Sequence, residues 1–210
     1  MTGRFIVFEG GEGTGKSTQV RLLTETLDTR GIASVVTREP GGTAGAEAIR
    51  SLLLNPPGEG WGPQAEAMLF AAARSDHINK LIKPAVAEGK WVLCDRYLDS
   101  SRAYQGGAGA VGDDAILTLH DIGSEGLLPD LTLLIDVPAD QVAARLKKRD
   151  GDVSDAIGGR DAAYHAAVNR TFRKIAEAEP DRFRIIDGQG SIEEVHQKVR
   201  DAIDSWTDFE

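Results

Sequence analysis

The segment that decides the fold is residues 4–19, which read RFIVFEGGEGTGKSTQ. Its first part is rich in β-branched and aromatic residues, as a buried strand is. It continues as Gly10-x-x-x-x-Gly15-Lys16-Ser17, the full phosphate-binding loop (P-loop) pattern, and then enters a stretch with apolar residues at helical spacing. In this strand–loop–helix context a chance glycine-rich turn is the weaker interpretation. The segment therefore predicts a site for a nucleoside triphosphate.

Each part of the loop has a physical role in holding phosphates. Glycines let the backbone curl so that several N–H groups face the phosphates, and the helix adds the positive end of its dipole. We expect Lys16 to bridge the β- and γ-phosphates and Ser17 to hold Mg²⁺. The predicted ATP-binding residues are Gly10, Gly11, Glu12, Gly13, Thr14, Gly15, Lys16, Ser17 and Thr18. The variable positions 11–14 include no basic residue, and Glu12 is acidic, which is unexpected in an anion site.

Composition sets limits on the class of protein. The chain has 210 residues, of which 41% are hydrophobic and 27% charged, and its formal net charge is −9. An acidic chain disfavours binding to nucleic acid or to an anionic membrane, although it leaves room for a local basic pocket. The single cysteine, Cys94, forms no disulfide within the chain, and the sequence has no long apolar run. The strand-like N-terminus argues against a signal peptide, so we expect a cytoplasmic protein.

Predicted strands and helices alternate along the whole chain. This alternation indicates an α/β protein with a three-layer P-loop NTPase fold: a five-stranded parallel sheet with helices on both faces. The predicted strands are 4–9, 33–38, 90–95, 131–137 and 183–188, and the predicted helices are 16–30, 46–54, 64–87 with a bend near Pro84, 114–122, 141–148, 162–178 and one from about 192. Residues 103–114 are predicted as a glycine-rich loop. No interdomain linker is visible, so residues 1–210 are expected to form a single domain.

Two stretches offer residues for a second substrate. Arg38 ends the second strand, at the edge of a parallel sheet where ligands bind, and could clamp a second phosphate. Phe70 and Arg74 are four residues apart in a predicted helix, so a ring that stacks on a base and a guanidinium that bonds it could share one face. The alternatives are a surface arginine beside a turn, and an ordinary core aromatic with a solvated neighbour.

A third stretch, CDRYLDSSRAYQGG, follows the third predicted strand. Asp95 ends that strand, where P-loop proteins keep the acidic residue that holds Mg²⁺, and Arg96 would point at the phosphates. Ser101 and Gln105 are four residues apart, and both can hydrogen-bond the edge of a base. The alternative for Asp95 is a helix N-cap.

Four motifs in this order, FEGGEGTGKST, TREPGGT, DRYLDSSRAYQG and LPDLTLLIDV, resemble bacterial thymidylate kinase, and the resemblance covers nearly the whole chain. It implies that Arg38 and Arg96 contact the phosphate of thymidine monophosphate (dTMP). It also implies that Phe70 stacks on thymine and that Arg74 bonds its carbonyl edge. The remaining residues implied to bind substrate are Ser101, Gln105, Arg50 and Glu9, the last near the sugar and the metal. The resemblance also implies a homodimer, and the alanine-rich helix 64–87 is the expected interface.

The implied reaction transfers the γ-phosphate of MgATP to dTMP, giving dTDP and ADP in dTTP biosynthesis, with Mg²⁺ as the cofactor. The acceptor is already an ionised phosphate, so the reaction requires no general base. The sequence agrees, because it shows no Ser-His-Asp or Cys-His set and no zinc-like spacing. The four histidines, His77, His120, His165 and His196, are expected at the surface or partly packed.

A basic segment is expected to supply cations for the transition state. Residues 147–162 resemble the mobile lid of thymidylate kinases that keep a catalytic arginine there, which leaves Arg149 and Arg160 as the two candidates beside Lys16 and Arg96. Glu12 would then seat a lid arginine. The alternative for the segment is a solvated amphipathic helix with a charged end. A different small-molecule P-loop kinase and a P-loop switch ATPase also remain open, although a switch would not need a second-substrate pocket.

Overall fold

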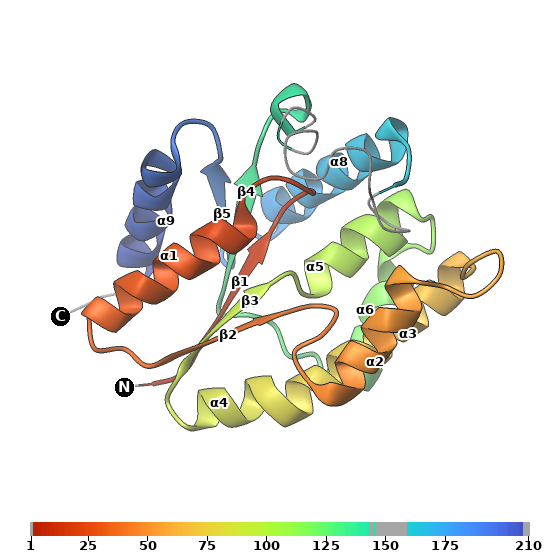
Figure 1. The fold of residues 1–210 in the computed structure, drawn as a ribbon, viewed down its shortest axis with the longest axis horizontal. Coiled ribbons are helices and arrows are strands. Elements are labelled where there is room, and N and C mark those ends of the chain that lie inside the picture. The colour runs from red at the N-terminus through yellow and green to blue at the C-terminus, as the bar shows by residue number, and fades with distance from the viewer. Residues whose placement is uncertain (1, 143–144, 146–158, 208–210) are drawn as a thin grey trace.

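The protein was analysed as a computed structural model that describes residues 2–142, 145 and 159–207. Its centre is a sheet of five strands, all parallel, in the order β2-β3-β1-β4-β5 (Figure 1). The strands are β1 (Arg4–Glu9), β2 (Ser34–Arg38), β3 (Trp91–Asp95), β4 (Leu131–Asp136) and β5 (Phe183–Asp187). The predicted fold class and all five strands are confirmed, with bounds within one residue.

Alternating side chains of the central strand β1 build two hydrophobic cores. Ile6 and Phe8 pack on one face of the sheet with Leu23 of α1 (Lys16–Thr29), and α9 (Ile192–Trp206) covers the same face. Phe5 and Val7 pack on the other face, against helices from the middle of the chain. Figure 1 shows this division, with α1 and α9 on one side of the sheet and α2 to α6 on the other. Burial of both faces explains why β1 is apolar throughout, without the polar alternation of a half-exposed strand.

Most of the remaining helices match the prediction in place but differ at their ends, whereas α5 and η2 were not predicted as helices. They are α2 (Ala44–Leu54), α3 (Pro63–His77), the π-helical η1 (Ile78–Ile82), α4 (Lys83–Ala87), α5 (Leu98–Ser101), the π-helical η2 (Arg102–Ala108), α6 (Asp113–Ser124) and α8 (Ala162–Ala178). The bend predicted near Pro84 takes the form of η1, because a proline without an N–H interrupts the hydrogen bonds of the preceding turn. The predicted helix 141–148 and the predicted lid 147–162 fall largely outside the described residues.

The prediction of a loop over 103–114 is wrong in its first half, where the chain forms the helix η2. Its glycines permit close packing. A Cβ atom on Gly107 would lie 2.4 Å from Thr171 Oγ1 on α8. Glycine here lets η2 contact α8 directly, and composition alone cannot distinguish this role from the flexibility of a loop.

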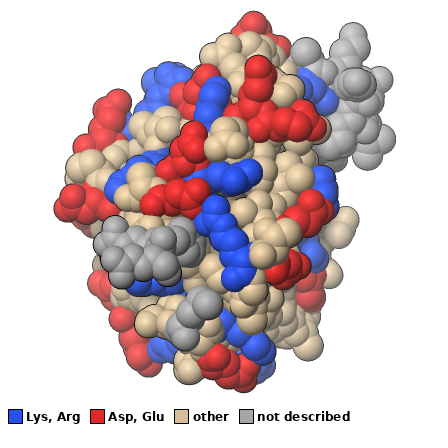
Figure 2. Space-filling view, turned by 90° about the vertical axis from the view of Figure 1, so that its left-hand side faces the viewer, with Lys and Arg blue, Asp and Glu red and all other residues tan. Residues whose placement is uncertain are grey.

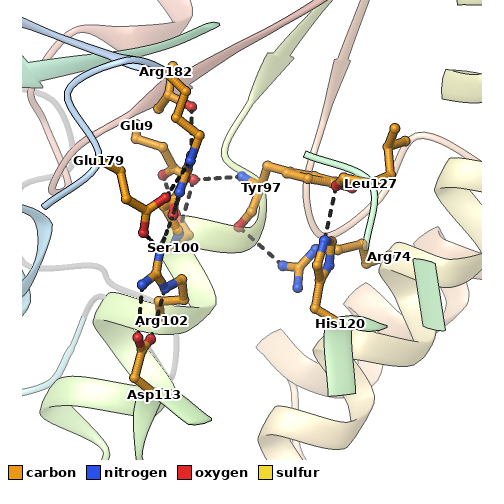
Figure 3. Close-up of polar contacts among 12 residues, drawn as sticks. Glu9, Arg74, Tyr97, Ser100, Arg102, Asp113, His120, Leu127, Glu179 and Arg182 are labelled. Atoms are coloured by element: carbon orange, nitrogen blue, oxygen red, sulfur yellow. Dashed lines mark hydrogen bonds and ion pairs between the residues drawn. The ribbon is translucent and has the colours of Figure 1, made fainter. Parts of the chain in front are cut away.

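A buried ion network joins the segment after β3 to the C-terminal third of the chain. Asp99 is fully buried, and Arg182 donates to both its carboxylate oxygens at 2.7 and 2.8 Å. Arg102 donates to Asp99, to Asp113 and, at 2.6 Å, to Glu179, as Figure 3 shows for the last two. Each buried charge in this network therefore has an opposite charge beside it, which a buried ion requires.

Replacement of Asp99 tests this network. Asp99→Ala leaves Arg182 and Arg102 without their shared acceptor, and breaking a buried pair in this way typically costs about 3–5 kcal/mol of unfolding free energy. The measurement is urea denaturation. Glu25→Ala, which removes an exposed i,i+4 partner of Arg21, is the control and should change stability by less than about 1 kcal/mol. Equal effects of the two variants would show that the network adds no stability.

Candidate active site

The P-loop lies at the carboxyl end of β1 and ends where α1 begins. Gly10, Gly13 and Gly15 have φ angles of 139°, 68° and 96°, in the region that favours glycine. A Cβ on Gly10 would lie 2.5 Å from the Ile135 carbonyl oxygen, so only glycine fits against β4. Gly15 is the N-cap of α1 and provides no side-chain cap, which leaves the first N–H groups of the helix for an anion.

Lys16 folds back over its own loop. Its ammonium group donates to the carbonyl oxygens of Gly10 at 3.1 Å and Gly11 at 2.8 Å. Burial lowers the pKa of Lys16 to about 8, and the charge of Arg96 acts in the same direction. A bound phosphate would favour the charged form of this lysine and replace the carbonyl oxygens as its partner.

Ser17 and Asp95 meet at the edge of the loop, where the Ser17 hydroxyl donates to the Asp95 carboxylate at 2.6 Å. Hydroxyl and carboxylate oxygens are the ligands that Mg²⁺ prefers, and they lie beside Lys16 in one pocket. Within the described ranges, no group of three or more His, Cys, Asp or Glu residues could enclose a metal ion. Magnesium commonly takes only one or two protein ligands and completes its shell with phosphates and water, so Ser17 and Asp95 are candidates to hold it.

Arg96 follows Asp95 directly and links the loop to a second pocket. Its φ is 70°, and its backbone N–H donates to the Phe8 carbonyl at 2.9 Å. Its guanidinium donates to the Gly10 carbonyl at 3.0 Å and to Glu12 at 2.6 Å, and lies 5.1 Å from the centre of the Tyr104 ring. The acidic residue of the P-loop therefore has a structural role, because it orients Arg96.

The second pocket opens beside Arg96 and collects four residues that the sequence singled out. They are Arg50 from α2, Phe70 from α3, Arg96, and Gln105 from η2, all of which line one cavity. Arg50 is held by a hydrogen bond of 2.8 Å to the Pro40 carbonyl. The cavity combines an aromatic ring, an amide and two guanidinium groups, which suits a base attached to a phosphate.

Arg74 and Ser101 lie behind the wall of this pocket. Arg74 donates to Ser101 Oγ at 2.8 Å and to the buried Glu39 at 2.7 Å, and only 3% of its side chain is exposed. Glu39 also accepts from His77 at 3.1 Å and itself lines the pocket. The structure thus brings Arg74 and Ser101, two of the predicted base-reading residues, into contact, and Glu39, which the sequence analysis did not single out, anchors Arg74.

His77 and His120 correct the expectation for the histidines. His77 is fully buried between Glu39 and Thr37, and His120 is 3% exposed. Burial lowers the pKa of His120 to about 4. Figure 3 shows His120 bonded to the Leu127 carbonyl, so it has a packing role.

Arg38 lies apart from the second pocket. It is 53% exposed and pairs with Glu47 of α2 at 2.9 Å, in a groove that also contains Ser17 and Asp95. Arg38 therefore lies in the same groove as the Ser17 and Asp95 oxygens, while the pocket of Phe70 is lined by Arg50 and Arg96.

Glu9 is the last residue of β1, directly before the P-loop, and is fully buried. It accepts from the backbone N–H groups of Tyr97 and Ser100 at 2.8 and 3.0 Å, and from the Ser100 hydroxyl at 2.6 Å (Figure 3). Burial, and then the charge of Asp99, raise the pKa of Glu9 to about 7. Glu9 therefore fixes the turn that carries Arg96, besides its proposed contact with substrate.

Three arginines come from the region of the predicted lid. Arg160 pairs with Glu66 of α3, which also bonds Gln105, and its guanidinium lies 4.7 Å from the centre of the Tyr164 ring. Arg145 donates to the Gly188 carbonyl at 3.0 Å and lines the P-loop pocket, a site cation that the sequence analysis did not identify. Arg149 lies outside the described residues.

The fold and this site define a P-loop kinase that phosphorylates a nucleoside monophosphate. A family model described as thymidylate kinase matches residues 8–199. The thymidylate kinase of Rhizorhabdus wittichii is 54% identical over 203 residues, which are 97% of this chain and 98% of that relative. The chain belongs to the thymidylate kinase family, as the sequence motifs predicted.

Two further relatives agree. The thymidylate kinase of Rhodopseudomonas palustris strain TIE-1 is 47% identical over 205 residues, covering 97% of this chain and 89% of that protein. The crystal structure of thymidylate kinase from Ehrlichia chaffeensis superposes with a TM-score of 0.77 at 32% identity, covering 97% of this chain and all of that chain. The described fold is thus the P-loop NTPase fold of this family.

The raised pKa of Glu9 predicts a pH dependence of stability. The ordinary pKa is 4.5 and the folded value about 7, so between these values the folded protein holds a proton that the unfolded chain has released. The stability that Glu9 contributes is complete below about pH 4.5 and is lost as the pH rises through about 7. Glu9→Gln removes this titration, so the loss of unfolding free energy from pH 5 to pH 8 should shrink by about 1–3 kcal/mol.

Urea denaturation at both pH values measures this change. Glu25→Gln, on the exposed face of α1, should keep the pH dependence of the wild-type protein. A Glu9→Gln variant whose pH dependence also matched the wild type would contradict the assignment.

Proposed function

We propose that the chain transfers the γ-phosphate of MgATP to dTMP, giving ADP and dTDP, the step that leads to dTTP. The observation that carries this proposal is the position of Arg96. Its guanidinium bonds the Gly10 carbonyl of the P-loop and also lines the pocket of Phe70, so one cation borders both phosphate sites. Family membership selects thymine as the base.

The chain's own residues account for the reaction by alignment and charge. An oxygen of the acceptor phosphate attacks the γ-phosphorus, the bond to the β,γ-bridging oxygen breaks, and ADP leaves with that electron pair. In the proposal, Lys16 and the N–H groups of the P-loop hold the donor, and Arg96 holds the acceptor phosphate. Ser17 and Asp95 would hold Mg²⁺, which when bound neutralises charge on the donor's phosphates.

The acceptor's nucleoside is assigned to the second pocket. Phe70 would stack on thymine and Gln105 would bond the edge of the base, and we propose that Arg74 and Ser101, behind the pocket wall, complete the base-reading set. The further substrate contacts that we propose are Glu9, Arg38 and Arg50, of which Arg50 lines this pocket. Rejection of the switch-ATPase alternative rests on this pocket, because a hydrolase needs no site for a second phosphorylated substrate.

The assembly and location are proposed from the resemblance and from surface chemistry. We propose a single domain over residues 1–210 that forms a homodimer in the cytoplasm, with α3 at the interface, since Met68 of α3 is 54% exposed. No helix in the described ranges has both the length and the apolar character that a membrane crossing needs. Basic and acidic side chains are interspersed on the face shown in Figure 2, which offers no broad basic surface for nucleic acid.

An acceptor assay tests the reaction. ADP formation from MgATP is measured without an acceptor and with each nucleoside monophosphate in turn. We expect ADP only in the presence of an acceptor, with dTMP strongly preferred, because transfer requires both pockets to be filled. Equal ADP release without an acceptor would identify a hydrolase, and preference for another base would identify a different P-loop kinase.

The lid arginines are tested by separate variants. We propose that residues 147–162 form a lid, and that Arg149 or Arg160 stabilises the charge on the moving phosphoryl group. The variant that removes the catalytic arginine should lower the maximal rate at least tenfold, about 1.4 kcal/mol of barrier. If neither Arg149→Ala nor Arg160→Ala does so, the lid is not the source of this cation.

A further inference from the structure

Glu66 is a buried acid beside the acceptor pocket that the reaction leaves without a role. It lies on α3, one turn before Phe70, but it is not among the residues that line the pocket. One carboxylate oxygen accepts from the amide nitrogen of Gln105 at 2.8 Å, and the other accepts from Arg160. Gln105 is 2% exposed and does line the pocket.

This contact decides which way the Gln105 amide points. The Glu66 carboxylate forms an ion pair with Arg160, and a carboxylate can only accept hydrogen bonds. The NH₂ end of the Gln105 amide must therefore face Glu66. The carbonyl oxygen is then the polar atom that Gln105 offers to the pocket, and rotating the amide would set two oxygens against each other inside the protein.

A second side chain on the same face of α3, Arg74, acts as a hydrogen-bond donor where Glu66 acts as an acceptor. Arg74 lies two turns beyond Glu66, and its guanidinium donates to Ser101 Oγ at 2.8 Å. Because the Ser101 oxygen accepts from a cation, its own hydrogen remains available as a donor. Glu66 thus fixes Gln105 as a hydrogen-bond acceptor toward the base, and Arg74 fixes Ser101, four residues earlier, as a donor.

We propose that Glu66 is a positioning residue that sets acceptor specificity, by holding the Gln105 amide with its carbonyl oxygen toward the base. Thymine presents an N3–H donor beside its carbonyl oxygens, whereas the N3 atom of cytosine is an acceptor. A fixed carbonyl oxygen therefore bonds thymine or uracil and repels cytosine. The inference deepens the proposed function and rests on it, because it assigns the base-reading polarity of the same pocket.

Glu66→Gln tests the proposal with little change of shape. A glutamine at 66 can donate or accept, so it pairs with the Gln105 amide in either orientation. The readout is the ratio of kcat/KM for dTMP to that for deoxycytidine monophosphate (dCMP). We expect this ratio to fall about tenfold or more, because the Gln105 amide can then turn its NH₂ group toward the base and donate to the N3 atom of cytosine. Where the wild-type turnover of dCMP lies below detection, its appearance in the variant is the expected result.

Deoxyuridine monophosphate (dUMP) separates this role from general loosening of the pocket. Uracil has the same N3–H as thymine and lacks only the methyl group, so the dTMP-to-dUMP ratio should stay within about twofold of the wild-type value. Both ratios come from one preparation, so the fraction of folded protein cancels. Glu125→Gln, at an exposed residue paired with Lys83, is the matched charge control and should leave both ratios unchanged.

Two results with the variant would overturn the proposal. One is an unchanged dTMP-to-dCMP ratio, and the other is a parallel fall of both ratios, which would show a purely structural role for Glu66. The wild-type protein provides the separate test of the proposed function. A wild-type protein that phosphorylates dCMP and not dTMP would refute that function itself, whereas normal dTMP kinase activity with an indifferent Glu66→Gln variant would refute only this inference.

Discussion

The two halves of the active site depend on one residue, Arg96, and on the way β3 ends. The backbone N–H of Arg96 bonds the Phe8 carbonyl of β1, and its left-handed conformation, with φ at 70°, turns the chain back across the P-loop. Neighbouring parallel strands end at the same edge of the sheet, so this turn is brought to the loop that follows β1. Without that register, the donor and acceptor pockets would have no common wall.

Several carboxylates hold this turn in place, and each of them bonds a different part of it. Glu9, at the end of β1, accepts hydrogen bonds from the backbone N–H groups of Tyr97 and Ser100. Glu12, in the P-loop, accepts a hydrogen bond from the Arg96 guanidinium. Asp99 connects the next turn to Arg182, which precedes β5. A non-glycine residue in the left-handed region is strained by about 1 kcal/mol or more, and such a conformation persists only where its surroundings hold it. The carboxylates around residues 96–100 provide those restraints.

The sequence was sufficient for features encoded locally. The P-loop, the five strands and the candidate residues Phe70 and Gln105 lie in stretches whose spacing or residue type carries a signal, whereas Arg50 was indicated by the family resemblance alone. The family resemblance supplied the roles that spacing left open for Phe70 and Arg74. Features that depend on packing between distant segments could not be predicted. The Glu39–Arg74 pair joins residues 35 positions apart, and the Gln105–Glu66 pair joins residues 39 positions apart. The η2 glycines were misjudged for the same reason, since their neighbour Thr171 is remote in sequence.

The cations of the two pockets are bonded to the protein's own oxygens. Lys16 is already bonded to the Gly10 and Gly11 carbonyls, Arg96 to Glu12, and Arg50 to the Pro40 carbonyl. A phosphate that binds these cations must therefore replace the hydrogen bonds that they make to protein oxygens. Small anions such as inorganic phosphate or sulfate gain little from that exchange, because charge is nearly all they offer. A nucleotide also gains from the stacking and hydrogen bonding of its base. Cations that are already paired with protein groups therefore favour the binding of whole nucleotides over that of simple anions.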